Sequence, residues 1–413
     1  MSVIGLFHPG RQHSLHTAAA LGSAGVLEWY ATSIYFDPSR LPYSALRALP
    51  AAPRRRLSGA FKRRASEFID PSKVRHLPAA EWLEMALARL GLRHAAGQVN
   101  AWGNRHFQRR VLELTRRQPV DRLWGFDTSS RHVFEAARSA GAVCILDQSI
   151  AHLGGVRAQL LDHRRRYGDL VPEREIPSQA AVDACTAEIA AASHVVVGSD
   201  YAAALARRHG GAEGRVHVCP YGYLESNFPV SAGRADGLGD LPVRFLFAGT
   251  VSARKGFHLL ADVFAAMPPT HGSLTMVGPS LIPGDVLRRH LGNIHYIPAV
   301  SNARLGEIMR SAHCFVFPSL HEGGGIVLYE AAASGLGIIQ APSCGDGVRA
   351  GPKGANGVVL AEASATALRA AVDAVIARPA ILRDWSEASR AMREERSWSA
   401  YRRRIVELLP SLV

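Results

Sequence analysis

Short apolar runs alternate with stretches of helical periodicity along nearly the whole chain, and this alternation constrains the fold more than any other feature. Continuous apolar runs are typical of strands buried on both faces of a parallel sheet, and helical segments between them predict β-α-β units. The predicted strands of the first half are Val3–Phe7, Leu27–Tyr35, Leu123–Phe126, Val143–Leu146, His194–Val197 and Val216–Cys219. Those of the second half are Arg244–Phe247, Ser273–Val277, Ile294–Ile297, Cys314–Phe317, Gly337–Ile339 and Gly357–Leu360. The sequence therefore predicts an α/β fold with two doubly wound sheets.

The length of the chain also favours two domains. With 413 residues, 47% of them hydrophobic, it is about twice the usual size of one domain and can bury two ordinary cores. The Gly-rich segment Ser231–Asp240 lacks apolar periodicity, so we place the domain boundary there. A basic, helix-rich insertion, roughly Ser44–Gln118, separates the early strands from the later ones. The tail Trp398–Leu409 has apolar residues at helical spacing and needs a surface to cover.

The composition excludes disordered, collagen-like and disulfide-scaffold proteins. The five cysteines lie far apart, without a C-x-x-C pair or a histidine spacing suited to zinc, which favours reduced thiols in a cytoplasmic protein. The N-terminus does not have the pattern of a signal peptide. The best candidate for a membrane span, Gly324–Ala341, is interrupted by Glu330, so an integral membrane protein is not expected.

The positive charge is concentrated in the first half of the chain. Of the net charge of +13, residues 1–220 contribute +10 and residues 221–413 contribute +3. The basic residues form clusters, and the first interpretation of these clusters is solvated helix faces. Binding to an anionic membrane surface or to a phosphorylated acceptor is the second interpretation, and binding to nucleic acid is the least favoured. The densest clusters are Arg54–Arg56, Lys62–Arg64, Arg109–Arg110, Arg116–Arg117 and Arg164–Arg166.

The loop after the predicted strand Arg244–Phe247 has the chemistry of a phosphate site. It carries Arg254, Lys255 and Gly256 into a predicted helix start, where backbone N–H groups add donors. Alone, such a pair of cations is more often a surface feature. However, the chain has 44 arginines and only 4 lysines, so Lys255 is an exception placed where a compact charge would help.

The loop after Cys314–Phe317 places two glutamates around three glycines. Glu322 precedes Gly323–Gly325, and Glu330 lies about one and a half turns into the next predicted helix. A Glu-x7-Glu spacing arises about once by chance in such a chain, and the simpler interpretation is one glutamate at a helix start and one on its exposed face. The glycines favour function, because they let backbone N–H groups approach a ligand closely. Glu330 has apolar neighbours and needs a partner, such as a sugar diol.

Residues 244–361 resemble the C-terminal half of GT-B retaining glycosyltransferases of the family 4 type. That family carries a strand–G–x–x–x–x–K–G loop and an E–G–x–G–x–x–x–x–E segment. Other segments resemble the family's interdomain crossing, linker and later loops, so that about residues 193–405 are covered well. These segments are Ser193–Asp200, Pro220–Gly222 with Phe228, Ala333–Leu336 and Gly354–Gly357, and the first half resembles the family at His8–Gly10 and Asp147–His152.

The resemblance implies a GT-B fold, with Rossmann-like domains at 1–222 and 223–394 and a last helix, about 395–413, packed back on the first domain. It implies no cofactor beyond the nucleotide-sugar substrate, metal-independent transfer with retention, and a leaving diphosphate able to accept the acceptor proton. It also assigns roles to individual residues. Lys255 would neutralise the diphosphate, Glu330 would hold the ribose, Glu322 with the N–H groups of Gly323–Ile326 would bind the sugar, Gly10 would approach the diphosphate, and His152 would face the transferred sugar.

The chain departs from the family pattern at three places. Thr250 stands where the family has an arginine, so that either Thr250 or Arg254 would replace this phosphate contact. Tyr221 and Leu224 replace the linker asparagine and aspartate, and Gly337 replaces a proline.

The nucleotide base, the sugar, the acceptor and the oligomeric state stay open. The expected partners are a nucleotide sugar and a carbohydrate or lipid-linked acceptor, as in polysaccharide or glycolipid assembly. The expected location is the cytoplasm, with an anionic inner membrane surface as a further partner. One alternative is a GT-B nucleotide-sugar epimerase or phosphorylase. The alternative of another class is a basic membrane- or nucleic-acid-binding protein without turnover.

Overall fold

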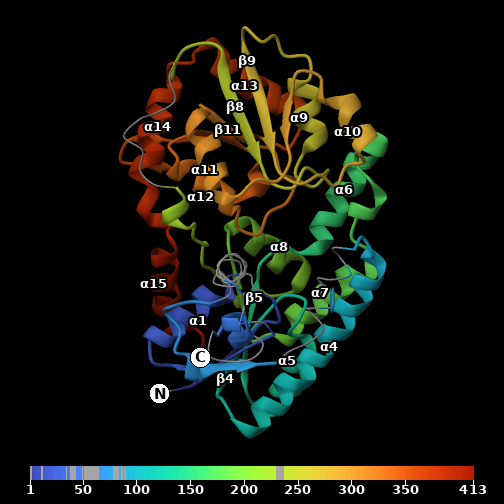
Figure 1. Ribbon diagram of the computed structural model, residues 1–413, viewed down its shortest axis with the longest axis vertical. Coiled ribbons are helices and arrows are strands. Elements are labelled where there is room, and N and C mark those ends of the chain that lie inside the picture. Colours follow the sequence, from blue (N-terminus) through green and yellow to red (C-terminus); the bar gives the residue numbers. More distant parts are fainter. Residues whose placement is uncertain are drawn as a thin grey trace.

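The computed structural model describes residues 2–10, 13–33, 35–37, 43–48, 50, 65–77, 83–84, 87, 90–228 and 237–413. Within them the chain forms two parallel sheets, one in each half of the molecule (Figure 1). The first sheet contains β1 (Ile4–Phe7), β2 (Leu27–Thr32), β3 (Val74–His76), β4 (Arg122–Phe126), β5 (Val143–Gln148), β6 (His194–Val197) and β7 (Val216–Val218). The second contains β8 (Val243–Ala248), β9 (Gly272–Val277), β10 (His295–Ile297), β11 (Cys314–Phe317), β12 (Gly337–Gln340) and β15 (Gly357–Val359).

The strand orders are β3-β2-β1-β4-β5-β6-β7 and β10-β9-β8-β11-β12-β15, with all neighbours parallel. In each sheet the order reverses once, between β1 and β4 and between β8 and β11. Ligands bind beyond the carboxyl ends of the strands at such a reversal. The predicted α/β class with two doubly wound sheets is confirmed.

Helices cover both sheets, and five of them begin at a serine that caps the first turn. Their bounds are α1 (Ser14–Ser23), α4 (Arg93–Arg117), α5 (Arg131–Ser139), α6 (Leu153–Tyr167), α7 (Gln179–Ala191), α8 (Asp200–Gly210), α9 (Phe257–Phe264), α10 (Gly284–Leu291), α11 (Asn302–Ser311), α12 (Ile326–Ala333), α13 (Ala365–Ala377), α14 (Ile381–Ala391) and α15 (Trp398–Leu408). The hydroxyl of a preceding serine accepts a hydrogen bond from the first turn of α7, α8, α11, α13 and α15. These caps set the helix starts at positions that the sequence itself marks.

The predicted strands match the observed ones closely, because most of them are apolar runs buried within a sheet. Two elements were missed. The edge strand β3 has three residues and pairs only with β2, and the hairpin β13 (Ala350–Gly351) and β14 (Gly354–Ala355) has two residues a side. Elements this short give no periodic signal. Part of the expected helical insertion is α4; the clusters at 54–56 and 62–64 lie outside the described residues.

The chain crosses between the two halves twice, at neighbouring places. The Tyr223 amide donates to the Arg396 carbonyl at 2.9 Å, and a Cβ on Gly222 would lie 2.5 Å from the Trp398 backbone nitrogen. Beyond the second crossing, α15 lies beside α1 in the half that holds both termini (Figure 1). The Tyr401 and Thr17 hydroxyls are 2.9 Å apart there. The domain limits drawn from the sequence stay a prediction.

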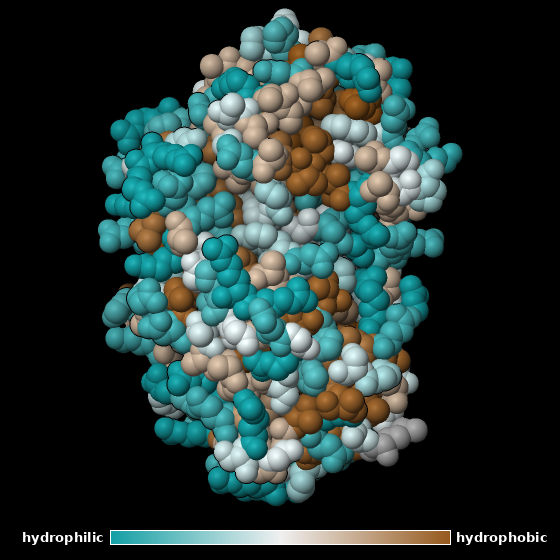
Figure 2. Space-filling view, turned by 180° about the vertical axis from the view of Figure 1, so that it is seen from behind, coloured by the Kyte–Doolittle hydropathy of each residue, from teal (hydrophilic) through white to brown (hydrophobic). Residues whose placement is uncertain are grey.

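Figure 2 shows the opposite side of the molecule, which is mostly hydrophilic, with separate hydrophobic patches on both halves. Among the described residues, no helix is both long and apolar enough to span a bilayer. All five cysteines are free thiols.

Candidate functional site

A cavity of about 580 Å³ lies between the two halves of the molecule, at the carboxyl ends of both sheets. The second half contributes the loops after β8 and β11, which flank its strand-order reversal. The first half contributes the loop after β5, the segment around Glu175 and the linker residue Tyr221. Its lining is Ser149, Ile150, Ala151, Leu153, Val156, Glu175, Pro177, Tyr221, Ala248, Gly249, Thr250, Arg254, Lys255, His321, Glu322, Gly323, Gly324, Gly325, Ile326 and Val327.

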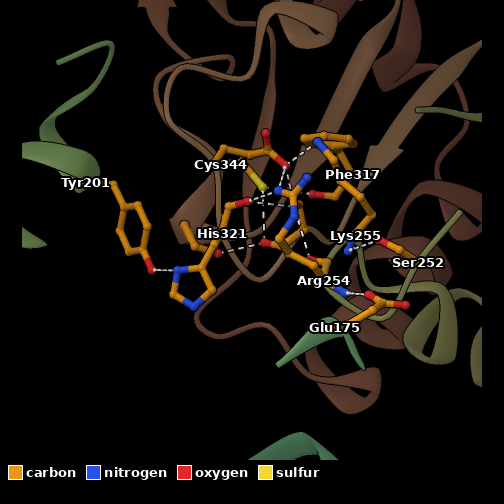
Figure 3. Close-up of polar contacts among 11 residues, drawn as sticks. Glu175, Tyr201, Ser252, Arg254, Lys255, Phe317, His321 and Cys344 are labelled. Carbon is orange, nitrogen blue, oxygen red and sulfur yellow. Dashed lines mark hydrogen bonds and ion pairs between the residues drawn. The ribbon is translucent and has the colours of Figure 1, made fainter. Parts of the chain in front are cut away.

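The loop after β8 brings two cations to this cavity. Gly256 precedes α9 with a φ of +78°, and a Cβ there would lie 2.3 Å from the Pro318 carbonyl oxygen. Glycine is therefore required both by the backbone and by the approach of the β11 loop. This approach places the ammonium of Lys255 over the Phe317 ring, 4.8 Å from its centroid (Figure 3), where it pairs with Glu322.

Glu322 is the centre of the charged cluster. Its Oε1 accepts from the Lys255 ammonium, from the Ser319 hydroxyl at 2.5 Å and from Arg254 Nη1 at 3.4 Å. Burial raises the pKa of Glu322, but the Lys255 and Arg254 cations and these hydrogen bonds outweigh it and hold the pKa below its usual value. Glu322 is therefore ionised at neutral pH. Since the contacts found within the described residues all go to Oε1, Oε2 is left to accept from a ligand.

The pKa of Lys255 lies below its usual value. Burial lowers its pKa, and so does the Arg254 cation, while the Glu322 carboxylate raises it. The side chain of Lys255 is 12% exposed and that of Arg254 is 39% exposed, so Lys255 lies at the floor of the cavity and Arg254 at its edge. Arg254 Nη1 also donates to the His321 carbonyl at 2.7 Å, which fixes the guanidinium beside the cavity.

Two of the three glycines after Glu322, Gly323 and Gly324, lie against the first domain. A Cβ on Gly323 would lie 1.8 Å from the Ser149 carbonyl oxygen, and one on Gly324 would lie 2.5 Å from the Tyr221 ring. Gly325 has a φ of +56° and precedes α12. The sequence argument explained these glycines by access to a ligand. The structure adds that Gly323 and Gly324 let the two domains come into close contact.

Eight of the residues predicted for the site line the cavity together. They are Thr250, Arg254, Lys255, Glu322, Gly323, Gly324, Gly325 and Ile326. Both substitutes for the missing family arginine, Thr250 and Arg254, are therefore placed to meet a ligand.

Glu330 lies just outside the lining, on α12, one turn beyond the lining residue Ile326. Its carboxyl group has no hydrogen-bond or ion-pair partner among the described residues. Burial raises its pKa to about 7. Such a group gains from a ligand that donates hydrogen bonds to it.

His152 does not line the cavity, and the catalytic role predicted for it stays a prediction. Its side chain is 1% exposed and caps α6: Nδ1 accepts from the Gly154 amide at 3.0 Å, and Nε2 lies 3.1 Å from the Thr186 hydroxyl. That hydroxyl donates to the Val182 carbonyl, so Nε2–H is the donor to it. Burial, together with repulsion from His209, lowers the pKa of His152 to about 4. Both ring nitrogens are used, and the histidine acts as a helix cap.

Gly10 follows β1 and is also not among the lining residues. A Cβ on Gly10 would lie 3.0 Å from the His8 ring, so its nearest neighbour is its own strand end. The next two residues of the chain lie outside the described part.

The sequence argument missed the contacts that the first domain makes with the loops of the second. The Tyr201 hydroxyl lies 2.6 Å from His321 Nδ1 (Figure 3), Glu175 Oε2 accepts from the Arg254 amide at 3.2 Å, and Ser199 Oγ donates to the Gly323 carbonyl at 2.7 Å. Each contact joins residues at least 79 positions apart, so no local pattern could reveal it.

A ligand in this cavity would meet two fixed cations, a fixed carboxylate and the first turn of α12. Phosphate groups suit the cations and the helix start, and hydroxyl groups suit the carboxylate. No group of three or more His, Cys, Asp or Glu residues in the described ranges could hold a metal ion.

Comparison with solved structures identifies the class. Sucrose-phosphate synthase from Thermosynechococcus elongatus aligns over 100% of this chain and 99% of its own, with a TM-score of 0.64 at 18% identity. Anabaena Alr3699/HepE, in complex with UDP and glucose, aligns over 100% of both chains with a TM-score of 0.61 at 14% identity. WaaG, a glycosyltransferase involved in lipopolysaccharide biosynthesis, aligns over 98% and 99% with a TM-score of 0.61 at 15% identity. The chain has the GT-B glycosyltransferase fold.

The second half of the chain matches the model of a known protein family. Residues 237–392 match the family model described as glycosyl transferases group 1. Over these residues the second half of the chain is similar to the group 1 glycosyl transferases, which supports a glycosyltransferase. A sequence search of the curated proteins gives no significant match.

Proposed function

We propose that this enzyme transfers a sugar from a nucleotide-diphosphate sugar to an acceptor hydroxyl with retention of configuration. The observation that carries the proposal is the buried Lys255–Glu322 pair at the floor of the interdomain cavity, beside the start of α12. The diphosphate would bind to Lys255, Arg254 and the N–H groups at the helix start. HepE, which shares the fold, is described in complex with UDP and glucose and with UDP-glucose, and this also supports a nucleotide-sugar donor.

Lys255 and Glu322 have different roles in the proposed reaction. As the bond between the anomeric carbon and the diphosphate breaks, negative charge grows on the leaving group, where Lys255 is already fixed. Glu322 stays ionised and accepts from hydroxyls of the transferred sugar through Oε2. No step in this scheme requires a metal ion, and the lining offers the cations that would otherwise be supplied by one.

The donor class is tested by thermal unfolding with UDP-glucose, GDP-glucose and ADP-glucose, each present in large excess. A ligand at a hundredfold excess over its Kd stabilises the folded state by about 2.7 kcal/mol, so the true donor class should raise Tm by several degrees. Failure of all three to shift Tm would contradict the proposed function.

Replacing Glu330 by Gln should reduce that shift, and wild-type donor affinity should depend on pH. Ribose hydroxyls donate best to an ionised carboxylate, and the pKa of Glu330 is about 7. Calorimetric titration should show affinity falling about tenfold from pH 8 to pH 6, with E330Q weak and independent of pH.

Unliganded stability supplies the control for this variant. Burial raises the pKa of Glu330 in the folded state, so ionisation of this carboxyl opposes folding. The contribution of Glu330 to the free energy of unfolding therefore falls as the pH rises from about 4.5 to 7. E330Q should therefore be at least as stable as wild type at pH 8. Equal donor affinity in the two proteins at every pH would remove Glu330 from the ribose-binding role.

The acceptor is proposed to be a carbohydrate or a lipid-linked carbohydrate, met at the cytoplasmic face of an anionic membrane. The exposed face of helix α4 supports a location at the membrane surface. Trp102, Arg105, Arg109 and Arg116 are exposed and, at their spacing, share one face of the helix. An exposed tryptophan beside arginines suits a headgroup layer, where each cation contributes about 1 kcal/mol.

Liposome sedimentation checks this surface. The wild type should bind vesicles containing anionic lipid, and the binding should fade with salt. The triple variant R105A/R109A/R116A should lose most of it, whereas R208A/R378A/R403A, which removes exposed arginines elsewhere, should not. Equal partition of wild type to neutral and anionic vesicles would leave these arginines as a solvated face.

A further inference from the structure

Two buried histidines join the first domain to the second beside the donor loop. His163 of α6 is 6% exposed, and His258 of α9 is 1% exposed. Nδ1 of His163 and Nε2 of His258 face each other at 2.8 Å, a hydrogen-bond distance. His258 is the third residue after Lys255, and α6 begins at Leu153, which lines the interdomain cavity. The pair therefore connects the two walls of the cavity, and it has no role in the proposed transfer.

The hydrogen bond between the two rings restricts where a further proton can bind. Two neutral imidazoles carry two hydrogens on four ring nitrogens, and one of these hydrogens lies between the facing nitrogens. The other is then on one of the two outer nitrogens. An added proton must occupy the second outer nitrogen, because two N–H groups would otherwise face each other and the bond would be lost. In every arrangement that keeps the bond, the charged pair therefore carries a hydrogen on the outer nitrogen of His258, Nδ1.

His258 Nδ1 has no acceptor for that hydrogen. This nitrogen is buried and has no hydrogen-bond partner within the described residues. A buried N–H group without an acceptor is unfavourable, and more so on a charged ring. The Tyr167 ring packs against His258 with the centroids 4.5 Å apart, and Tyr167 belongs to α6, as His163 does. Separation of the two domains would remove both rings from His258 and let water accept from it, so that a protonated His258 favours separation.

The charged groups around the pair do not offset its burial. Burial has the largest effect on His163 and lowers its pKa; two carboxylates raise this pKa and one arginine lowers it, and it stays below its usual value. Burial, with repulsion from His163, lowers the pKa of His258 to about 3. The charged and titratable groups near the pair, from α6, α9, the β11 loop and the loop after β15, are Asp162, Arg166, Tyr167, Asp262, His321 and Glu362.

We propose that the His163–His258 pair is a pH-sensitive latch, which holds the two domains together around the interdomain cavity at neutral pH and lets them separate in mildly acidic solution. This inference goes beyond the transfer reaction and does not depend on it. The latch acts on the cavity through α6, because Leu153 and Val156 of this helix line the cavity and His163 follows on the same helix. Closure of the cavity then releases protons to the solvent.

The direction of the pH effect follows from the two states of His258. In water an imidazole has a pKa of about 6.5, whereas the pKa of His258 in the joined domains is about 3. Below pH 6.5 the separated domains therefore bind a proton that the joined domains do not. The contact is fully favourable above that pH and weakens as the pH falls toward 3. His321, which contacts Tyr201 of the first domain, acts in the same direction, because burial and Arg254 lower its pKa to about 3.

Small-angle X-ray scattering of the whole, unliganded chain tests the latch. His258 alone should raise the ratio of separated to joined domains about thirtyfold between pH 7.5 and pH 5.0. Wild type should therefore have a larger radius of gyration at pH 5.0, with an unchanged far-UV circular dichroism spectrum. The double variant H163Q/H258Q, whose amides can bond to each other and do not titrate, should lose most of this increase. H94Q/H271Q removes one exposed histidine from each domain and should expand as wild type does.

Two results would overturn the latch. One is a radius of gyration in wild type that stays the same at both pH values. The other is an equal increase in wild type and in H163Q/H258Q, which would assign the separation to other groups. The single variant H258Q repeats the comparison where the double variant fails to fold: it keeps His163 and should show a smaller increase than wild type, and an increase equal to that of wild type overturns the proposal.

Discussion

Replacing Lys255 by Ala should lower transfer by about two orders of magnitude or more, the scale observed when one preorganised charge-stabilising donor is removed. The ammonium lies at the cavity floor, over the Phe317 ring, and is held by Glu322 before any ligand arrives. Its position is therefore set in advance, and no reorganisation is needed as charge develops on the diphosphate. Steady-state release of nucleoside diphosphate measures the loss.

The same substitution should change the acidity of Glu322. Without Lys255, the Glu322 carboxylate keeps only Arg254 and the Ser319 hydroxyl as partners. The effect of burial is then less fully offset, and the pKa of Glu322 should rise. Activity that remains in K255A should then fall as the pH is lowered, more steeply than in wild type. K353A, which removes an exposed lysine between β13 and β14, is the matched control. Near wild-type turnover in K255A would assign the diphosphate to Arg254 or Thr250.

The strands and the donor loops were predictable because their causes are local. Each strand is an apolar run buried by its own sheet, and the carboxyl ends of parallel strands meet at one edge. The loops after β8 and β11 therefore had to lie together once the strands were found. The resemblance to the family then assigned Lys255 and Glu322 to one donor site.

Residues whose neighbours are brought together only by the folded chain could not be predicted in this way. Tyr221 looked like a departure from a family motif, yet its ring packs against Gly324 and against His13 at a centroid distance of 4.3 Å. His152 looked like a catalytic histidine, and its partners Gly154 and Thr186 use both ring nitrogens. In each case the deciding neighbours come from a turn or a helix whose position only the folded chain fixes.

The glycine at position 323 offers a direct test of how strictly the two domains must fit. A Cβ there would lie 1.8 Å from the Ser149 carbonyl oxygen and 3.1 Å from the Ile150 Cα, both backbone atoms of the first domain. Backbone cannot rotate out of the way as a flexible side chain can. Gly323→Ala must therefore separate the domains at the cavity floor, where the Ser199 hydroxyl now holds the Gly323 carbonyl at 2.7 Å.

Turnover in G323A should fall by about a hundredfold, because a displacement of about 1 Å at reacting groups has an effect of that size. Donor affinity should fall less, since Lys255, Arg254 and Glu330 belong to one domain and keep their relative positions. Small-angle X-ray scattering should show a larger radius of gyration. G97A is the matched control: this glycine is exposed on α4 with open space around it, and alanine there should favour the helix. Wild-type turnover in G323A would show that the domains close differently during catalysis, and that the contact between Gly323 and Ser149 does not set the working geometry of the cavity.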